Sequence, residues 1–273
     1  MIKLLILGAL GSMGKLISKL ALEDNDIEVV AACDIINTGK KLGQLVGAYD
    51  PNENVIEKID NLGQIIEDSS PEVAVDFSIA EATEQNCMIC AEKGIPCVIG
   101  TTGLSEEFLK VFEETIKQKE IPAVISSNMA TGVNILFKIT SILTEFVSDW
   151  DIEVIEAHHH RKVDAPSGTA LTLAKLISET LGVNLDEVGK FGRSKGPNKR
   201  KIGAKNEIGI HSIRAGDIVG DHTILYAGPG ERIELKHQAH SRDCFASGAI
   251  KAVKFLSQAK ESRIYTTAEV LGL

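Results

Sequence analysis

The sequence predicts an α/β protein that has a parallel-sheet domain and a smaller α+β domain with an open mixed sheet. In the first half of the chain, apolar strand-like runs alternate with helical patterns, and this alternation is typical of a parallel sheet. A glycine-containing turn directly follows the first of these runs. After Asn128 the alternation ends, and strand-like runs then lie close together, which suits an antiparallel or mixed sheet.

The first part of the chain is expected to alternate strands with helices. The expected strands are short runs rich in aliphatic residues, at residues 3–7, 28–33, 73–77, 97–99 and 123–126. The expected helices lie between them, at residues 12–22, 80–93 and 105–119.

The later part of the chain is expected to begin with a helix at residues 134–147 and a strand that ends in adjacent histidines. Pro166 can open the next helix, at residues 167–181, because the amide that proline lacks would be unpaired there. The buried face of this helix would carry Leu171, Leu173, Ala174 and Ile177. Strands are then expected at residues 208–213, 222–226 and 232–238, and a last helix at 246–257 that packs back on the first domain.

The length of 273 residues allows two ordinary domains with full cores. We expect residues 1–129, completed by 241–273, to form a dinucleotide-binding domain, and residues 130–240 to form a substrate-binding and oligomerisation domain. The formal charge of −9 argues against nucleic acid as a partner. No apolar run approaches the roughly 20 residues of a membrane span, and the first apolar run is too short for a signal peptide, so we expect a cytoplasmic protein without membrane contact.

The five cysteines form no disulfide framework, since their number is odd and their spacing irregular. Cys87 and Cys90 make a C-x-x-C pair, but this pair lies inside an expected helix. A zinc site would also require a second such pair, and the sequence has none. We therefore expect buried, reduced thiols and no metal site.

The turn after the first strand carries Gly8, Gly11 and Gly14 and opens a helix. Glycines there let the backbone approach a pyrophosphate, which then sits at the helix N-terminus. The spacing is G-x-x-G-x-x-G rather than G-x-G-x-x-G, so the spacing alone is a weak signal. Its context strengthens it, because Asp34 ends the second strand, where an acidic side chain holds the ribose hydroxyls. The first domain is therefore predicted to be Rossmann-type and to bind a dinucleotide.

The residue at the ribose position also bears on the choice of cofactor. An aspartate at position 34 disfavours a 2′-phosphate, and Ile35 and Ile36 supply no cation to offset its charge. We therefore expect NADH to be preferred, while Lys40 and Lys41 leave NADPH possible.

Three later strand ends are small and polar, and ligands in such sheets bind beyond the carboxyl ends of the strands. They are Asp76-Phe77-Ser78, the run Gly100-Thr101-Thr102-Gly103, and Ser126-Ser127-Asn128-Met129. Small residues leave room for a nicotinamide ring, so together these strand ends are consistent with one cofactor groove that Phe77 would help to line.

The segment from Glu156 to Thr169 places histidines and a lysine between an apolar strand and a helix start. Backbone amides of Gly168 and Thr169 would point out of the first helical turn, where the helix dipole favours anions. Histidine and lysine can bind carboxylates and donate protons near neutral pH. The segment therefore predicts a site for a small polyanionic substrate that must be protonated.

Three other interpretations are weaker. A zinc hydrolase would leave the glycine turn unexplained, and on a strand His158 and His160 could share a metal but His159 could not. An aldehyde dehydrogenase that acts through a thioester would need a cysteine beside the His-Lys segment. A protein that senses NADH without catalysis would not need the cationic cluster.

A basic run extends from Lys190 to Lys205 and includes Arg193, Lys195, Lys199, Arg200 and Lys201. It is either a solvated loop or a loop that steers an anionic substrate.

The run Glu156-Ala-His-His, followed by Lys162-Val-Asp-Ala-Pro-Ser-Gly-Thr169, resembles the substrate motif of the 4-hydroxy-tetrahydrodipicolinate reductase family, formerly called dihydrodipicolinate reductases. The resemblance covers essentially the whole chain. Its other segments match in order and spacing: Asp76-Phe-Ser78, Val98-Ile-Gly-Thr-Thr-Gly103, Gly132-Val-Asn134, Arg214-Ala-Gly-Asp-Ile-Val-Gly220 and Ser241-Arg242 with Phe245-Ala246.

The resemblance implies a two-domain enzyme of lysine and diaminopimelate synthesis that uses NADH or NADPH to reduce a cyclic unsaturated dicarboxylate, and a homotetramer. It implies roles for the following residues: Gly8, Met13 and Gly14 at the pyrophosphate, Asp34 at the ribose, Gly100, Thr102, Ser127 and Met129 around the nicotinamide, His158 and Lys162 as the catalytic pair, and His159, Gly168 and Thr169 at the substrate carboxylates. The family more often reads His-His-Arg-His-Lys where this chain has His158-His-His-Arg-Lys162, which leaves the roles of His160 and Arg161 open. The implied chemistry fits the residues, because hydride added to a conjugated imine creates negative charge that a nearby acid must protonate.

Overall fold

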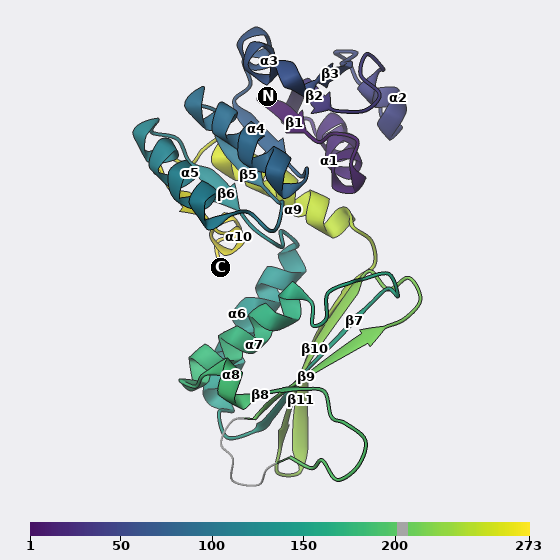
Figure 1. The fold of residues 1–273 in the computed structure, drawn as a ribbon, viewed down its shortest axis with the longest axis vertical. Helices are drawn as coiled ribbons and strands as arrows, with labels where there is room; N and C mark the ends of the chain where they lie inside the picture. Colours follow the sequence, from purple (N-terminus) through teal and green to yellow (C-terminus); the bar gives the residue numbers. More distant parts are fainter. Residues whose placement is uncertain (201–206) are drawn as a thin grey trace. The chain divides into compact units, whose positions relative to one another are not determined.

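The computed structural model describes residues 1–200 and 207–273, and these form two compact units. Unit 1 contains Met1–Thr131 and Arg242–Leu273, and unit 2 contains Gly132–Ser241. The chain therefore leaves unit 1 after its sixth strand, builds unit 2, and returns to finish unit 1 (Figure 1).

Unit 1 is built on a parallel sheet of seven strands in the order β12-β6-β5-β4-β1-β2-β3. Every strand pair in it is parallel. The strands are β1 (Ile2–Leu7), β2 (Ile27–Asp34), β3 (Ile56–Lys58), β4 (Val73–Asp76), β5 (Cys97–Ile99), β6 (Ala123–Ile125) and β12 (Ile264–Tyr265). The helices are α1 (Ser12–Glu23), α2 (Leu42–Val46), α3 (Leu62–Ser69), α4 (Ala80–Glu92), α5 (Glu106–Gln118), α9 (Asp243–Leu256) and α10 (Thr267–Val270), with a short 3₁₀ turn, η1 (Ile59–Asn61).

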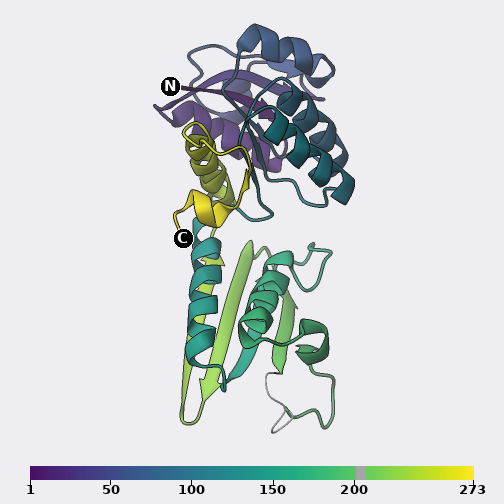
Figure 2. The same ribbon diagram turned by 90° about the vertical axis from the view of Figure 1, so that its left-hand side faces the viewer.

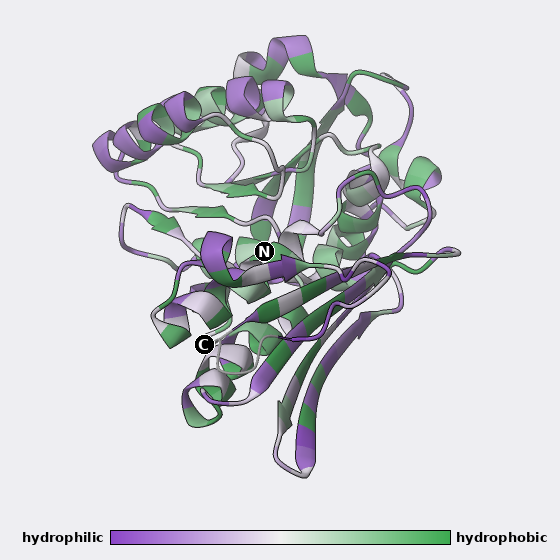
Figure 3. Cartoon of the chain, turned by 60° about the horizontal axis from the view of Figure 1, so that its bottom comes forward, coloured by the Kyte–Doolittle hydropathy of each residue, from purple (hydrophilic) through white to green (hydrophobic). Residues whose placement is uncertain are grey.

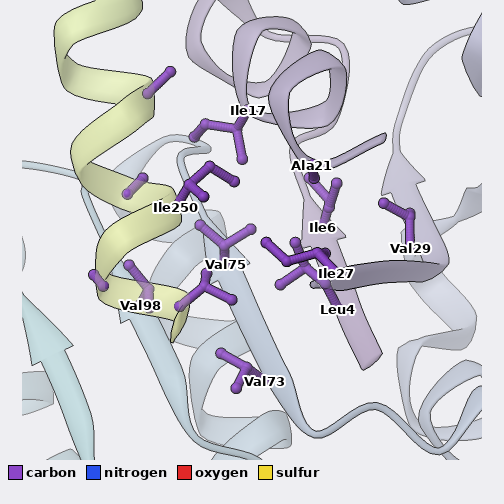
Figure 4. Packing of buried hydrophobic residues seen from close by; sticks show 14 of the residues in the cluster. Leu4, Ile6, Ile17, Ala21, Ile27, Val29, Val73, Val75, Val98 and Ile250 are labelled. Carbon is purple, nitrogen blue, oxygen red and sulfur yellow. The ribbon is translucent and has the colours of Figure 1, made fainter. Parts of the chain in front are cut away.

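Both faces of this sheet are covered by helices, which explains why aliphatic residues on both faces of its central strands are buried. In β1, Leu4 and Ile6 belong to a core that also contains residues of α1 and α9, whereas Leu5 and Leu7 belong to a second core. That second core is completed by buried residues of α3, α4 and α5. Figure 4 shows the first core, where Ile17 and Ala21 of α1 and Ile250 of α9 lie over side chains of the central strands.

Unit 2 is built on a mixed sheet of five strands in the order β11-β10-β7-β9-β8. The strands are β7 (Asp151–His158), β8 (Gly189–Phe191), β9 (Ile208–Arg214), β10 (Gly220–Gly228) and β11 (Glu231–Ala239), and the helices are α6 (Thr131–Phe146), α7 (Gly168–Leu181) and α8 (Leu185–Val188). The central strand β7 is parallel to β9 and antiparallel to β10. Residues of α6 and α7 pack with buried side chains of β7, β9 and β10 in one core, and Figure 2 shows both helices beside the sheet.

The predicted fold class is confirmed, with a parallel sheet first and a mixed sheet second. The hydropathy colouring in Figure 3 shows why the pattern was readable, since hydrophobic and hydrophilic residues alternate along the strands and helices. The prediction omitted the short elements α2, β3, η1, α3, α8, β8, β12 and α10. It also began α6 at residue 134, three residues after its start at Thr131.

Two local predictions about α7 were wrong. Leu171 was expected on the buried face of this helix but is 39% exposed, whereas Leu173, Ala174 and Ile177 are buried as expected. Pro166 does not open α7, because the helix begins at Gly168 and Ser167 is its N-cap residue, whose hydroxyl accepts the amide of Ala170. The hydroxyl of a serine can accept a hydrogen bond from an amide of the first helical turn, and proline has no group that can do so. Ser167 is therefore the N-cap residue, and Pro166 lies before the helix. The peptide bond between Ala165 and Pro166 is cis.

Among the described residues, the helices are all too short or too polar to cross a lipid bilayer.

Candidate functional site

The glycine turn between β1 and α1 folds tightly on itself. Gly8 has a positive φ of 71°, and the Gly11 amide donates to the Gly8 carbonyl at 3.1 Å. A Cβ on Gly14 would lie 1.9 Å from the Gly8 oxygen, so only glycine lets α1 start this close to the strand. No side chain caps the N-terminus of α1, and Gly11 and Ser12 are exposed. First-turn amides that no side chain caps, beside exposed glycine backbone, fit a pyrophosphate.

Asp34, the last residue of β2, lies beside this turn. One carboxylate oxygen accepts the Leu10 amide at 2.8 Å, and the other accepts the amides of Ile35 and Ile36. The acidic side chain is thus fixed at the end of the turn, where the sequence placed it. Of the nearby cations, Lys40 donates to the Asn37 side chain and Lys41 forms an ion pair with Glu53.

The ends of β4 and β5 are tied together by the buried Asp76. Its carboxylate accepts the Ser78 amide and the hydroxyls of Ser78 and Thr83, while the side-chain amide of Asn86 donates to its second oxygen. The Thr83 hydroxyl oxygen also lies 2.8 Å from the hydroxyl of Thr101, which follows β5. One carboxylate therefore shapes two of the three strand ends that were predicted to line the cofactor groove.

Close packing at these strand ends needs glycine and a flat ring. A Cβ on Gly100 would lie 2.0 Å from the ring of Phe77, and one on Gly8 would lie 3.2 Å from Ser78 Cβ. Thr102 and Ser127 are exposed, whereas Met129 is buried and its carbonyl lies where a Cβ on Gly248 of α9 would fall. The structure thus brings the predicted cofactor residues to one edge of the sheet in unit 1. Met13, in the first turn of α1, is partly buried against the core that α1 and α9 form with the sheet.

The predicted catalytic residues lie in unit 2, at the end of β7. His158 is 8% exposed, and its Nδ1 lies 2.6 Å from a carboxylate oxygen of Glu156. The two residues share a face of the strand because they are two positions apart. His159 follows the strand and donates its backbone amide to Ile218, and His160 contacts the Gly216 carbonyl through both its amide and its ring.

Glu156 is completely buried and carries its charge there. Arg214, which stands beside His158 in the register of β7 and β9, binds the carboxylate with both terminal nitrogens, at 2.9 and 2.8 Å. Burial raises the pKa of the Glu156 carboxyl, but hydrogen bonds from Arg214, His158 and Ser212 outweigh this and lower it to about 2. An unpaired buried carboxylate would cost several kcal/mol, so the charge of Glu156 is stable in the interior only because these donors surround it.

Lys162 lies in the loop between β7 and α7. Its ammonium pairs with the Asp164 carboxylate at 2.7 Å, and its side chain is 22% exposed. Arg214 also donates to the Asp164 carbonyl, so the guanidinium that holds Glu156 also holds this loop. Hydrogen bonding to Lys162 lowers the pKa of Asp164.

The start of α7 lies against the same group of residues. The Ser167 amide donates to Glu156 at 3.1 Å, and the Ser167 hydroxyl lies 3.1 Å from Nε2 of His222. Gly168 and Thr169 are the first two helical residues, Gly168 is exposed, and nothing lies within 4 Å of where its Cβ would be. The predicted anion-binding turn therefore lies beside His158 and has open space in front of Gly168.

His222 of β10 is a further member of the group that the sequence did not reveal. It is buried, and its ring makes an edge contact with that of His158 at 5.2 Å between centroids. Burial, and then repulsion from His158, lower its pKa to about 4, so it is neutral near pH 7. The sequence motifs include Glu156 and Arg214 but predict no role for either residue. The two-residue spacing of Glu156 and His158 on an expected strand would have placed them on one face.

The remaining predictions concern groups away from this site. In the basic run, Arg193 and Arg200 both bind Glu153 and Glu207, whereas Lys201 and Lys205 lie outside the described residues. Cys33, Cys87, Cys90 and Cys97 are buried thiols that form no disulfide, and Cys244 is a partly buried thiol. Within residues 1–200 and 207–273, no cluster of three or more histidine, cysteine or acidic residues is arranged to hold a metal ion.

Comparisons with known proteins cover the whole chain. Residues 2–129 match the model of the N-terminus of dihydrodipicolinate reductase, and residues 132–271 match that of its C-terminus. The 4-hydroxy-tetrahydrodipicolinate reductase of Methanocaldococcus jannaschii is 45% identical over 100% of this chain and 98% of its own. That of Methanothermobacter thermautotrophicus is 42% identical over 100% of both chains.

Solved structures agree with these relatives. A dipicolinate-bound dihydrodipicolinate reductase from Paenisporosarcina sp. TG-14 matches 97% of both chains with a TM-score of 0.77 and 27% identity. An amine dehydrogenase from Mycobacterium smegmatis matches with a TM-score of 0.63 at 13% identity, which shows a shared fold alone. The matched models and the relatives over the full length confirm the resemblance read from the motifs: the chain belongs to the dihydrodipicolinate reductase family of NAD(P)H-dependent oxidoreductases.

Proposed function

We propose that this chain reduces 4-hydroxy-tetrahydrodipicolinate to tetrahydrodipicolinate in lysine and diaminopimelate biosynthesis, with NADH as its preferred electron donor. The observation that carries the proposal is the arrangement at the end of β7, where His158, Lys162 and the first turn of α7 are connected through Glu156 and Arg214. This arrangement unites proton donors with an anion-binding helix start, and a cyclic dicarboxylate needs both.

The cofactor would be held by unit 1. The uncapped start of α1 and the glycine turn fit its pyrophosphate, and Asp34 fits its adenosine ribose. Phe77, Gly100, Thr102, Ser127 and Met129 would surround its nicotinamide, which supplies a hydride when bound. The preference for NADH rests on Asp34 and on Lys40 and Lys41, which are engaged with Asn37 and Glu53 rather than with a phosphate position.

The substrate would be held by unit 2. The amides of Gly168 and Thr169, with the side chain of His159, would bind its carboxylates and set its orientation. The substrate becomes a conjugated imine when its 4-hydroxyl group leaves as water. As hydride then reaches this imine, negative charge develops on the ring, and His158 and Lys162 would stabilise that charge and deliver the proton. Both groups are held by hydrogen bonds before the substrate arrives, so little reorganisation is required.

The first experiment measures NADH oxidation by the purified protein, with the substrate formed in the cuvette from pyruvate and aspartate semialdehyde by its synthase. The Lys162→Ala variant should lose a factor of about 100 or more in kcat, the range expected for loss of a general acid. Lys175→Ala is the matched control, because Lys175 is also a lysine of unit 2 paired with a carboxylate, Glu179, but lies exposed on α7. It should keep full activity.

The outcomes separate the parts of the proposal. Equal activity of Lys162→Ala and the unchanged protein would remove Lys162 from the chemistry while keeping the reaction. Binding of NADH without any oxidation would reject the reaction itself. A kcat/KM for NADPH equal to or above that for NADH would reject the cofactor preference alone.

A further inference from the structure

Glu156 is the common partner of three parts of the site. Its oxygens contact Nδ1 of His158 at 2.6 Å, the guanidinium of Arg214 at 2.8 and 2.9 Å, and the backbone amide of Ser167 at 3.1 Å. These partners come from β7, from the end of β9 and from the cap of α7. The carboxylate is 0% exposed, so the protein supplies its hydrogen bonds.

The contact with His158 determines which ring nitrogen carries a proton. A pKa of about 2 keeps Glu156 ionised at neutral pH, and an ionised carboxylate only accepts hydrogen bonds. Nδ1 of His158 must therefore be the donor, which leaves Nε2 as the ring atom that exchanges protons with a ligand. Gly220 packs closely against that atom, since a Cβ there would lie only 3.1 Å from Nε2.

Arg214 extends the same control to Lys162. One of its terminal nitrogens bonds both Glu156 and the carbonyl of Asp164. The Asp164 carboxylate in turn pairs with Lys162 at 2.7 Å. A continuous chain of contacts thus runs from the ring of His158 to the ammonium of Lys162, and every member of it belongs to unit 2.

We propose that Glu156 and Arg214 are the positioning residues of this reductase: Glu156 sets the tautomer and orientation of His158, and Arg214 couples that setting to the loop that carries Lys162. The inference rests on the proposed function, since it assigns the proton donors to His158 and Lys162. Neither Glu156 nor Arg214 contacts the reacting atoms in this scheme, because the hydrogen-bonding groups of both are bound to other residues of the protein.

The other ionisable groups around His158 do not substitute for this pair. His222 of β10 contacts the ring but is held neutral by burial. His159 and Lys162 lie in the loop that follows β7, and Asp164 is committed to Lys162. Glu156 is thus the carboxylate that contacts the His158 ring in the described part of unit 2.

The test substitutes Glu156→Gln and compares it with Glu153→Gln. Glu153 lies on the same strand, is partly buried, and also binds two arginines and a histidine: Arg193, Arg200 and His211. None of these partners belongs to the His158 network, so Glu153 controls for the loss of an ion pair on β7. Glu156→Gln should lower kcat about 100-fold, as expected when a catalytic group is displaced by about 1 Å. Glu153→Gln should stay within about threefold of the unchanged protein, and KM for NADH should be unchanged in both because unit 1 is untouched.

Histidine ¹⁵N NMR reads the tautomer without any turnover. In the unchanged protein, His158 should show the proton on Nδ1 in its neutral form, and this signature should persist in Glu153→Gln. In Glu156→Gln the side-chain amide can donate to Nδ1, so the proton should move to Nε2 in a measurable fraction of molecules. This signature would not respond to a merely structural role of Glu156.

A second variant guards against misfolding. Arg214→Lys keeps the charge but loses the two-nitrogen grip on Glu156, and should lower kcat about tenfold while leaving the His158 tautomer in place. A Glu156→Gln protein that keeps both the kcat and the Nδ1–H signature of the unchanged protein would overturn the proposal. If the unchanged protein binds NADH but does not turn over, the proposed function fails, and the NMR comparison still decides whether Glu156 sets the His158 tautomer.

Discussion

At the scale of single residues, close approach of backbone to backbone decides what can stand at several positions. Gly14 is the sharpest case, since a Cβ would lie 1.9 Å from the Gly8 oxygen. Gly11, three positions earlier, has only ordinary contacts at its Cβ position, the nearest at 3.4 Å. The two glycines of one motif therefore have different physical reasons: Gly14 allows the helix to pack, and Gly11 leaves the turn open.

Gly14→Ala should lower the free energy of unfolding by about 2–3 kcal/mol, because overpacking against fixed backbone is costly. It should also weaken NADH binding, since the turn must move to accommodate the methyl group. Gly11→Ala should change the free energy of unfolding by less than about 1 kcal/mol. Urea unfolding and NADH fluorescence titration of both variants would check this, and equal stability of the two would contradict it.

His222 should make stability depend on pH. Its pKa is about 4 in the folded protein, below the ordinary 6.5 of the unfolded chain, so its contribution is fully present above pH 6.5. As the pH falls from 6.5 to 4, the unfolded state binds the proton first, and stability should fall by up to about 3 kcal/mol, at about 1.4 kcal/mol per pKa unit.

His222→Gln should remove this part of the pH dependence, because glutamine does not titrate and can still bond the Ser167 hydroxyl. The measurement is the free energy of urea unfolding at several values between pH 7 and 4. Identical pH dependence in the variant and the unchanged protein would show that another group, such as the less buried His237, whose pKa burial also lowers, is responsible.

At the scale of elements, the sequence predicted those whose periodicity is long or whose flanks are distinctive. The strand at 97–99 was located to the residue, because Pro96 and Gly100 bound it. Short elements were missed for two reasons. The first is that the two-residue strand β12 forms by pairing with β6, which is far away in the sequence. The second is that α3 has only eight residues, which is too short for a clear helical period even though Leu62, Ile65 and Ile66 lie on one face. The network around Glu156 was missed because Arg214 reaches it from a neighbouring strand, and strand order cannot be read from one strand alone.

The elements at the cofactor edge depend on Asp76 for their relative placement. Asp76→Asn should lower the free energy of unfolding by about 2 kcal/mol. The NH₂ group of the new asparagine would point at a hydrogen-bond donor whose proton the Asp76 carboxylate now accepts. It should also raise KM for NADH, since the ends of β4 and β5 lose their common anchor. Asp68→Asn is the control, as Asp68 is an exposed acceptor of one Gln64 bond on α3. A Asp76→Asn protein as stable as this control would contradict the role assigned to Asp76.

At the scale of the whole molecule, unit 2 leaves apolar surface uncovered in the isolated chain. Ile135, Ile139, Ile142 and Phe146 of α6 are all exposed, and Phe146 is 80% exposed. In addition, β11 forms an edge of the five-stranded sheet. Exposed apolar side chains at helical spacing and an edge strand are features that association of subunits can bury.

We expect a homotetramer, as the family resemblance implies. Light scattering after size-exclusion chromatography should give four times the mass of one chain. Ile139→Lys together with Phe146→Lys should shift the mass to a smaller species if the α6 residues are buried between subunits. A single-chain mass for the unchanged protein would reject the tetramer.

The order of the chain has a consequence for synthesis. Unit 1 is completed by residues after 241, among them α9, whose Ala246, Ala249, Ile250, Ala252 and Val253 are buried in a core against α1 and the strands β4 and β5. A ribosome that has released the first 241 residues has therefore made every strand of that sheet except β12, but not α9, which together with α1 covers one of its faces. The nascent chain must carry the part of this face that α9 covers exposed throughout the translation of unit 2, and only residues after 241 can cover it.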